Sequence, residues 1–216
     1  MDKVPAKKLD LRKQFKHLYL PSAKAVAVVD VPEMKFVMVD GCIEPDKTPN
    51  TSPSFQEALA ALYGAAYTLK FGLRFRPVDP IDYPVMALEG LWTTPGGGED
   101  FATSTEWQWT MMIMQPDFIT PEMFADAVAQ ARKKRDNPHL DKLRLGNFRE
   151  GLSIQILHVG PYADEPRTLE KMAVFAAERG YTFQGRHHEI YLGDPRRTKP
   201  ENLKTVLRHP VLAEAS

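Results

Sequence analysis

The chain has 216 residues, enough for one large domain or a fused pair with a real core. Its 28 basic and 28 acidic side chains cancel, so bulk charge indicates neither nucleic acid nor an acidic substrate as a partner. The single cysteine, Cys42, excludes an internal disulfide framework and a cysteine-rich metal site. No early apolar run is typical of a signal peptide, and no stretch is long enough to span a membrane, so we expect a cytoplasmic protein.

Residues 1–24 form a locally basic N-terminal segment. Leu11, Phe15 and Leu18 recur at helical spacing, which predicts a short solvated helix docked by its aromatic side. A nucleic-acid-binding arm is the alternative. We favour the helix because the basic run is short and is not repeated elsewhere.

Two strands and a long helix are expected next. The apolar residues 25–31 and 35–41 predict the strands. The helix is expected over residues 54–71, where Ser54 and Glu57 have capping-box spacing. Its apolar stripe comprises Phe55, Leu59, Leu62, Ala66 and Leu69. This stripe predicts a face packed in the core rather than a cofactor site.

Residues 85–93 predict a strand with Glu89 in its middle. Gly96 to Gly98 predict a hairpin tip, because a strand, rather than the helix of a phosphate-binding loop, is expected to follow. The partner strand, residues 105–114, places Trp107 and Trp109 on one face. Two tryptophans on one face form either a core or a stacking platform, and the core interpretation is the safer one.

In the remaining chain, Thr120 and Pro121 have the pattern of a helix start, and the helix is expected to reach about Arg135. Residues 143–149 and 152–159 predict a hairpin that turns near Glu150 and Gly151. A helix over 166–179 would end at Gly180. Pro200 is expected to start a last short helix, with Leu203, Val206 and Leu207 facing inward.

The segment His187 to Pro195 predicts a strand ended by a turn at Asp194-Pro195. Alternation puts His187, Glu189 and Tyr191 on one face. His188, Ile190 and Leu192 lie on the other face, which we expect to be largely apolar and packed against a helix. The first face has two interpretations, a binding cleft or an ordinary exposed polar face, and from this segment alone we favour the exposed polar face.

Both parts of the chain contain a strand, a long helix and a strand with a central glutamate, which suggests a duplication. We expect a single domain, residues 1–216, with a first half at about 25–135 and a second half at about 140–212. A pseudo-twofold α+β fold would then place a ligand cleft at the junction of the halves.

Candidate chemistry is sparse. No zinc-ligand set, Walker motif, nucleophile elbow or dinucleotide fingerprint is present, so we expect no metal and no cofactor. Cys42 is a weak candidate nucleophile and is better interpreted as a small buried residue. Two carboxylates and four aromatic residues remain: Glu89, Glu189, Trp92, Trp107, Trp109 and Tyr191. Acid and aromatic groups together suit a planar or cationic apolar ligand, through stacking and cation–π attraction. A screened glutamate can also act as a general acid or base.

Several longer segments have the pattern of motifs from a known family. They are His188–Thr198 (HEIYLGDPRRT), Pro200–Arg208 (PENLKTVLR), Leu88–Trp92 (LEGLW), Val31–Met34 through Asp40–Gly41, and Leu18–Tyr19 with Pro21–Lys24. Over nearly the whole chain, the sequence resembles the GyrI-like small-molecule-binding family. It is most similar to the stand-alone, single-domain branch. The resemblance implies a duplicated strand-helix-strand-strand module with an aromatic-lined cleft between the halves and a central glutamate.

The resemblance also implies roles for single residues. By motif, Glu189 is the central acid, Tyr191 lies beside it, and Glu89 and Trp92 belong to the first-half motif. Trp107 and Trp109 are assigned to the aromatic wall by strand pairing alone. His187 shares the face of Glu189 and completes the predicted ligand-binding set.

Three functions follow from the resemblance. The first is binding of lipophilic, planar or cationic molecules, as in multidrug-responsive effector domains. The second is detoxification by a hydrolase that opens the cyclopropane of DNA-alkylating compounds, with Glu189 and Tyr191 as catalytic residues. The third is modulation of a protein partner, as by a topoisomerase inhibitor. No helix-turn-helix region precedes the domain, so we expect no direct DNA binding.

Overall fold

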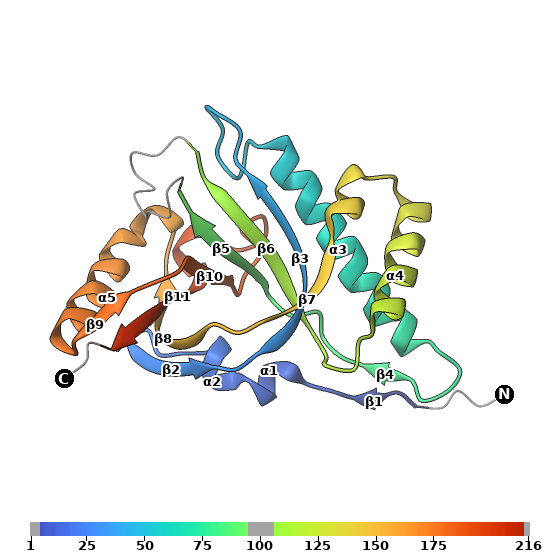
Figure 1. Ribbon diagram of the computed structural model, residues 1–216, viewed down its shortest axis with the longest axis horizontal. Helices are drawn as coiled ribbons and strands as arrows, with labels where there is room; N and C mark the ends of the chain where they lie inside the picture. Colours follow the sequence, from blue (N-terminus) through green and yellow to red (C-terminus); the bar gives the residue numbers. More distant parts are fainter. Residues whose placement is uncertain (1–4, 95–105, 214–216) are drawn as a thin grey trace. The chain divides into compact units, whose positions relative to one another are not determined.

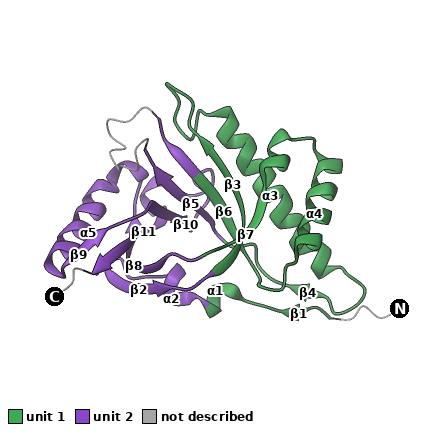
Figure 2. Ribbon diagram, viewed as in Figure 1, with its two compact units in different colours: residues 1–14, 34–86, 110–148 green, residues 15–33, 87–109, 149–216 purple. Residues whose placement is uncertain are grey.

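The computed structural model describes residues 5–94 and 106–213 (Figure 1). The chain forms two compact units, each assembled from segments far apart in the sequence (Figure 2). Unit 1 comprises residues 1–14, 34–86 and 110–148, and unit 2 comprises residues 15–33, 87–109 and 149–216. The units therefore interleave along the chain, whereas the predicted halves are consecutive. The single-domain boundary and the pseudo-twofold relation remain predictions.

The described elements mix α and β structure, as the predicted α+β class requires. The helices are α1 (Leu11–Gln14), α2 (Lys16–Tyr19), α3 (Pro53–Arg74), α4 (Pro121–Lys134) and α5 (Pro166–Glu178), with 3-10 turns η1 (Pro138–Lys142), η2 (Tyr162–Asp164) and η3 (Pro200–Asn202). The strands are β1 (Lys7–Lys8), β2 (Ala27–Val31), β3 (Met34–Cys42), β4 (Ile81–Asp82), β5 (Leu88–Thr93), β6 (Gln108–Gln115), β7 (Arg144–Phe148), β8 (Gly151–Val159), β9 (Tyr181–Phe183), β10 (His187–Tyr191) and β11 (Lys204–Ala213).

Unit 1 carries β6, β3 and β7 side by side, and a short parallel pair, β1 and β4. The predicted helix start at Thr120 is confirmed, because the Thr120 hydroxyl accepts from the amide of Met123. The start of α3 differs from the prediction. Ser52, rather than Ser54, accepts from the amide of Phe55, and Pro53 occupies the first helical position. Proline suits that position because its missing N–H would have no helical partner there.

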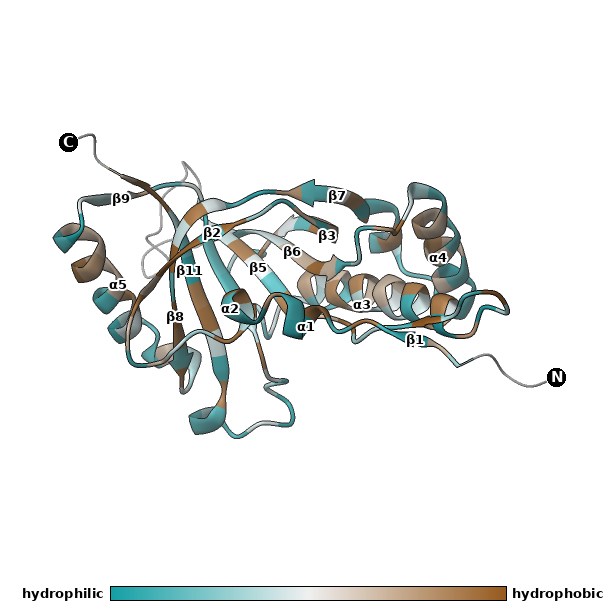
Figure 3. Cartoon of the chain, turned by 90° about the horizontal axis from the view of Figure 1, so that it is seen from below, coloured by the Kyte–Doolittle hydropathy of each residue, from teal (hydrophilic) through white to brown (hydrophobic). Residues whose placement is uncertain are grey.

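Unit 2 contains an antiparallel run of strands in the order β2, β8, β11, β10 and β5, and β9 pairs with β11. Helix α5 packs on this sheet. Its bands of hydrophobic and hydrophilic residues in Figure 3 are those of a helix with one buried side. The core beneath it consists of Ile154, Ile156, Met172, Ala176, Leu207 and Val211. Gly180, with φ of 64°, follows α5 and confirms the predicted helix end.

Two predicted elements are wrong. The expected hairpin of residues 143–149 and 152–159 does not form, because β7 pairs with β3 whereas β8 pairs with β2 and β11. The expected C-terminal helix is the ten-residue strand β11, preceded only by the short turn η3. The spacing of Leu203, Val206 and Leu207 is compatible with a helix. The segment is a strand because its backbone hydrogen-bonds to β8 on one side and to β10 on the other.

Candidate functional site

Strand β10 has two differently built faces. Its register places Glu189 opposite Leu207 and Tyr191 opposite Thr205 on β11. Leu207 belongs to the core under α5, so Glu189 and Tyr191 lie on the α5 side of the sheet. On β5, Trp92 pairs with His187 and shares this side.

Five side chains on the α5 side, here called the acid–aromatic cluster, interact with one another: Trp92, Tyr162, Glu165, Glu189 and Tyr191. The indole N–H of Trp92 donates to the Tyr191 hydroxyl over 2.8 Å, and Tyr162 meets Tyr191 edge-on with ring centroids 6.0 Å apart. Glu165 directly precedes α5 and is bonded to the Thr205 side chain, beside Tyr191. The Glu189 side chain keeps 17% exposure, so it is the carboxylate that a solvent-borne molecule can reach.

Glu189 raises the pKa values of three neighbouring groups in this cluster. Burial, and then the charge of Glu189, raise the pKa of Glu165 to about 9. Burial and Glu189 also raise the pKa of Tyr191 well above its usual value, and that of Tyr162 to about 12. Both phenols therefore stay neutral, and Glu165 retains a proton at neutral pH. The cluster offers a net negative charge between aromatic walls.

The other predicted aromatic and histidine residues occupy different places. Trp107 meets Trp92 edge-on, with ring centroids 6.0 Å apart, and so extends the aromatic wall. Trp109 is 2% exposed and belongs to the core. His187 is buried, and its Nε2 lies 3.4 Å from a carboxylate oxygen of Glu189.

A hollow of about 320 Å³ opens beside His187. It is lined by residues of α5, by Phe183 of β9 and by His209 of β11. The rings of His187 and His209 stack at 6.1 Å, so they form one wall of the hollow. His187 thus connects an apolar recess to the carboxylate of Glu189.

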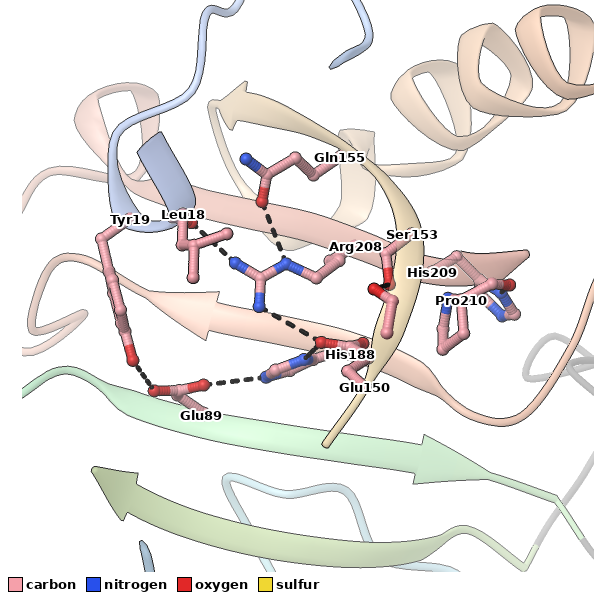
Figure 4. A network of polar contacts seen from close by, with 11 residues as sticks. Leu18, Tyr19, Glu89, Glu150, Ser153, Gln155, His188, Arg208, His209 and Pro210 are labelled. Atoms are coloured by element: carbon pink, nitrogen blue, oxygen red, sulfur yellow. Dashed lines mark hydrogen bonds and ion pairs between the residues drawn. The ribbon is translucent and has the colours of Figure 1, made fainter. Parts of the chain in front are cut away.

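The opposite face of β10 carries a buried polar network, shown in Figure 4. Its members are Tyr19, Glu89, Glu150, Gln155, His188 and Arg208. His188 lies between two carboxylates, with Nε2 at 3.1 Å from Glu89 and Nδ1 at 2.9 Å from Glu150. Both imidazole nitrogens face acceptors, an arrangement that requires the doubly protonated, cationic ring.

Arg208 and Tyr19 complete the network. The Arg208 guanidinium donates to Glu150 (3.2 Å), to Gln155 (2.9 Å) and to the backbone carbonyl of Leu18 (2.7 Å). The Tyr19 hydroxyl donates to Glu89 over 2.5 Å. Two carboxylates therefore face two cations, and the network ties α2 to strands β5, β10 and β11.

The pKa values of the network follow from this pairing. Burial alone would lower the pKa of His188, but Glu150 and the hydrogen bond to Glu89 outweigh it and raise the pKa. Burial alone would raise the pKa of Glu150, but His188 and Arg208 lower it to about 2. Burial and Glu89 hold the pKa of Tyr19 far above its usual value. The network is thus ionised but electrically balanced.

The face on which Glu89 lies gives it a role different from the expected one. Glu89 pairs with Ile190 across β5 and β10, whereas Glu189 pairs with Gly90, so the two glutamates point to opposite sides of the sheet. Glu89 is fully buried and already bound by Tyr19 and His188. The expectation that both acids line one site is therefore not met. The expected apolar face of His188 and Ile190 is instead partly a charged network.

Other sequence candidates contribute little. Cys42 is exposed, contrary to the buried position expected for it. Across residues 5–94 and 106–213, no group of three or more His, Cys, Asp or Glu is arranged to hold a metal ion. In the same ranges no helix is long and apolar enough to cross a membrane. The expected hairpin tip at Gly96 to Gly98 lies outside the described residues.

Sequence reasoning missed Tyr162 and Glu165, which lie in the turn before α5. Gly160 and Pro161 are typical of a turn, so the sequence predicts only the end of a hairpin for this segment. The available signal was an acidic residue, Glu165, which lies immediately before Pro166 at a helix start and three residues after Tyr162. That signal is common at helix starts and does not by itself indicate a site.

The comparisons with known proteins agree with this architecture. Residues 24–212 match the family model of the GyrI-like small molecule binding domain. The chain belongs to this family. No match was found among curated proteins.

Three solved structures from Listeria innocua are similar over the whole of their own chains. An uncharacterized conserved protein is 37% identical over 94% of this chain, with a TM-score of 0.85. A hydrolase is 35% identical over 94% of this chain, with a TM-score of 0.79. Another structure of a hydrolase is 36% identical over 95% of this chain, with a TM-score of 0.81.

Proposed function

We propose that the protein binds lipophilic monocations at the acid–aromatic cluster, with Glu189 as the counter-charge. The observation that carries this proposal is the position of Glu189, which is partly exposed among aromatic rings and lies beside no Lys or Arg in the described ion pairs. A half-buried carboxylate without a strong cationic partner attracts a cation from solvent.

The aromatic residues supply the rest of the binding energy. Trp92, Trp107 and Tyr191 offer ring faces and edges, and each ring can add about 0.5–2 kcal/mol of cation–π attraction. The hollow beside His187 offers room for an apolar substituent of the ligand. Glu89 has no part in this site, because it is held in the network on the other face.

The test is a tryptophan-fluorescence titration with tetraphenylphosphonium, a lipophilic monocation. We expect saturable quenching by the wild-type protein and a loss of affinity of at least tenfold in Glu189→Gln, which keeps the shape and removes the charge. Glu178→Gln, an exposed position at the end of α5, is the matched control and should bind normally. Equal affinity in wild type and Glu189→Gln would refute the proposal.

A second candidate function is hydrolysis of cyclopropane-bearing electrophiles at the same cluster. Two observations favour it: the similar Listeria innocua structures described as hydrolases, and the presence of Glu165, a carboxyl group with a raised pKa, near the carboxyl group of Glu189. Glu189 would accept a proton from water as the water oxygen bonds to the ring carbon. The ring C–C bond would break, and Glu165 would protonate the ligand oxygen that receives the electron pair.

Mass analysis of the ligand separates the two functions. A cyclopropane-bearing compound recovered with one added water, in the presence of wild type but not of Glu189→Gln, would establish the enzyme. Recovery of unchanged compound after saturable binding would leave a binding protein. Normal turnover by Glu189→Gln would remove Glu189 from the chemistry.

A further inference from the structure

Resting on the proposed ligand site, we infer that Glu165 is its second carboxyl group and shares a single proton with Glu189. A bound monocation displaces this proton into solvent. Glu165 thereby makes the affinity for the cation depend on pH.

The first support is the placement of Glu165. The residue is 8% exposed, and its Oε1 is buried and has no hydrogen-bond partner among the described residues. The carboxyl group is bonded to the side chain of Thr205, which lies directly opposite Tyr191 in the pairing of β11 with β10. An acid with an unused buried oxygen is therefore held next to the residues of the ligand site. Such an oxygen is costly unless it is protonated or meets a donor.

The second support is the charge of the surroundings. The charged and titratable groups that interact with Glu165 are Glu189 and Tyr191 from β10 and Tyr162 from η2. His158 of β8 lies opposite Thr205 in register and is bonded to Thr168 and to the carbonyl of Pro161, on either side of Glu165 in the chain. No described ion pair joins Glu165 to Lys, Arg or His, and His187 lies against Glu189 instead. Two carboxylates that repel each other cannot both ionise cheaply in a largely buried cluster. The raised pKa of Glu165, about 9, agrees with this geometry.

The consequence is an exchange of one cation for one proton. When a monocation enters, Glu165 loses its proton to solvent, and the two carboxylates face the cation and the neutral phenols. A neutral ligand releases no proton. By linkage, affinity for the cation rises by up to tenfold per pH unit while the pair holds its proton. If the cation bound to one carboxylate that stays ionised throughout this pH range, its affinity would not change with pH.

The experiment measures proton release directly. Tetraphenylphosphonium is titrated calorimetrically near neutral pH in buffers that differ in ionisation enthalpy, with wild type, Glu165→Gln and the control Glu178→Gln. We expect about one proton released per bound cation by wild type and by the control, and none by Glu165→Gln. The affinity of Glu165→Gln should also lose its rise with pH.

An infrared measurement on the wild-type protein alone gives an independent readout if Glu165→Gln folds poorly. Wild type near neutral pH should show the carbonyl band of a protonated, buried carboxyl group, and saturating tetraphenylphosphonium should remove it. The absence of this band would overturn the inference.

The outcomes separate this inference from the proposed function. Tight binding that depends on Glu189 but releases no proton would overturn the role of Glu165 and leave the ligand site intact. Binding that is unchanged in Glu189→Gln, or no binding of the probe at all, would overturn the ligand site and this inference with it.

Discussion

The two faces of β10 both carry glutamate, histidine and tyrosine side chains, yet they balance their charges differently. On one face, Glu89 and Glu150 meet His188 and Arg208, and every charge has an opposite neighbour within 3.2 Å. On the other, Glu165 and Glu189 meet phenols and indoles, and the nearest ionisable base is His187 at 3.4 Å from Glu189. The balanced face can stabilise the fold, whereas the unbalanced face keeps a charge available for a ligand.

The network also positions the ligand site. Successive residues of a strand point to opposite sides, so fixing His188 fixes the direction of its neighbour Glu189. Arg208 anchors β11 in the same way, and its neighbour Leu207 lies opposite Glu189. The buried network on one face of the sheet therefore fixes the positions of the partly exposed residues on the other face.

The largest effect is expected from Glu150→Ala on the balanced face. The substitution leaves His188 and Arg208 buried without their shared carboxylate, which costs about 3–5 kcal/mol of unfolding free energy. Urea denaturation measures it, with the exposed Glu170→Ala of α5 as the control, expected to change stability by less than about 0.5 kcal/mol. Equal stabilities of the two variants would show that the network does not hold the sheet.

A smaller loss is expected from Tyr19→Phe. Removing the hydroxyl leaves an oxygen of Glu89 buried without that donor, at a cost of about 1–3 kcal/mol. The control is Tyr67→Phe on α3, where the side chain is 46% exposed and the same change should be nearly neutral. Indistinguishable denaturation midpoints would mean that Glu89 finds another donor.

The pH dependence of stability distinguishes the faces further. The pKa of Glu165 is raised on folding, so its contribution is fully present below the unfolded pKa near 4.5 and is lost as pH rises toward about 9. The unfolding free energy should fall by at most about 1.4 kcal/mol per pH unit in this window.

Substitution of Glu165 by Gln should remove that alkaline slope. Glu150 acts in the opposite direction, because its pKa is lowered to about 2 and its contribution is lost as pH falls from about 4.5 toward 2. His188, with its raised pKa, adds stability that is present below its unfolded pKa near 6.5 and is lost as pH rises through its folded value. An alkaline slope that persists unchanged in Glu165→Gln would assign it to His188.

The smallest effect is expected from Glu189→Gln. Removal of this charge relieves the repulsion with Glu165, so the unfolding free energy should rise slightly, by no more than about 1 kcal/mol, while the affinity for the cation falls at least tenfold. The measurement pairs urea denaturation with the fluorescence titration. A loss of stability comparable to that of Glu150→Ala would show that Glu189 is a structural residue.

Much of the architecture was accessible from the sequence because it depends on local patterns. Alternating and helical periodicity located α3, α4, α5 and most long strands, and Thr120 and Gly180 marked helix ends correctly. Motif resemblance indicated the family, and alternation put Glu189, Tyr191 and His187 on one face. Each of these signals is carried by residues close together in the chain.

Only the tertiary structure decided which segments pair and which charges meet. The segment after Pro200 became the strand β11 because β8 and β10 flank it, and β7 and β8 separated because each found another partner strand. Tyr19, Glu89, Glu150, His188 and Arg208 come from five distant segments, and Glu165 reaches Glu189 from the turn before α5. Sequence spacing carries no record of such contacts, because burial and opposite charge select partners in space and not along the chain.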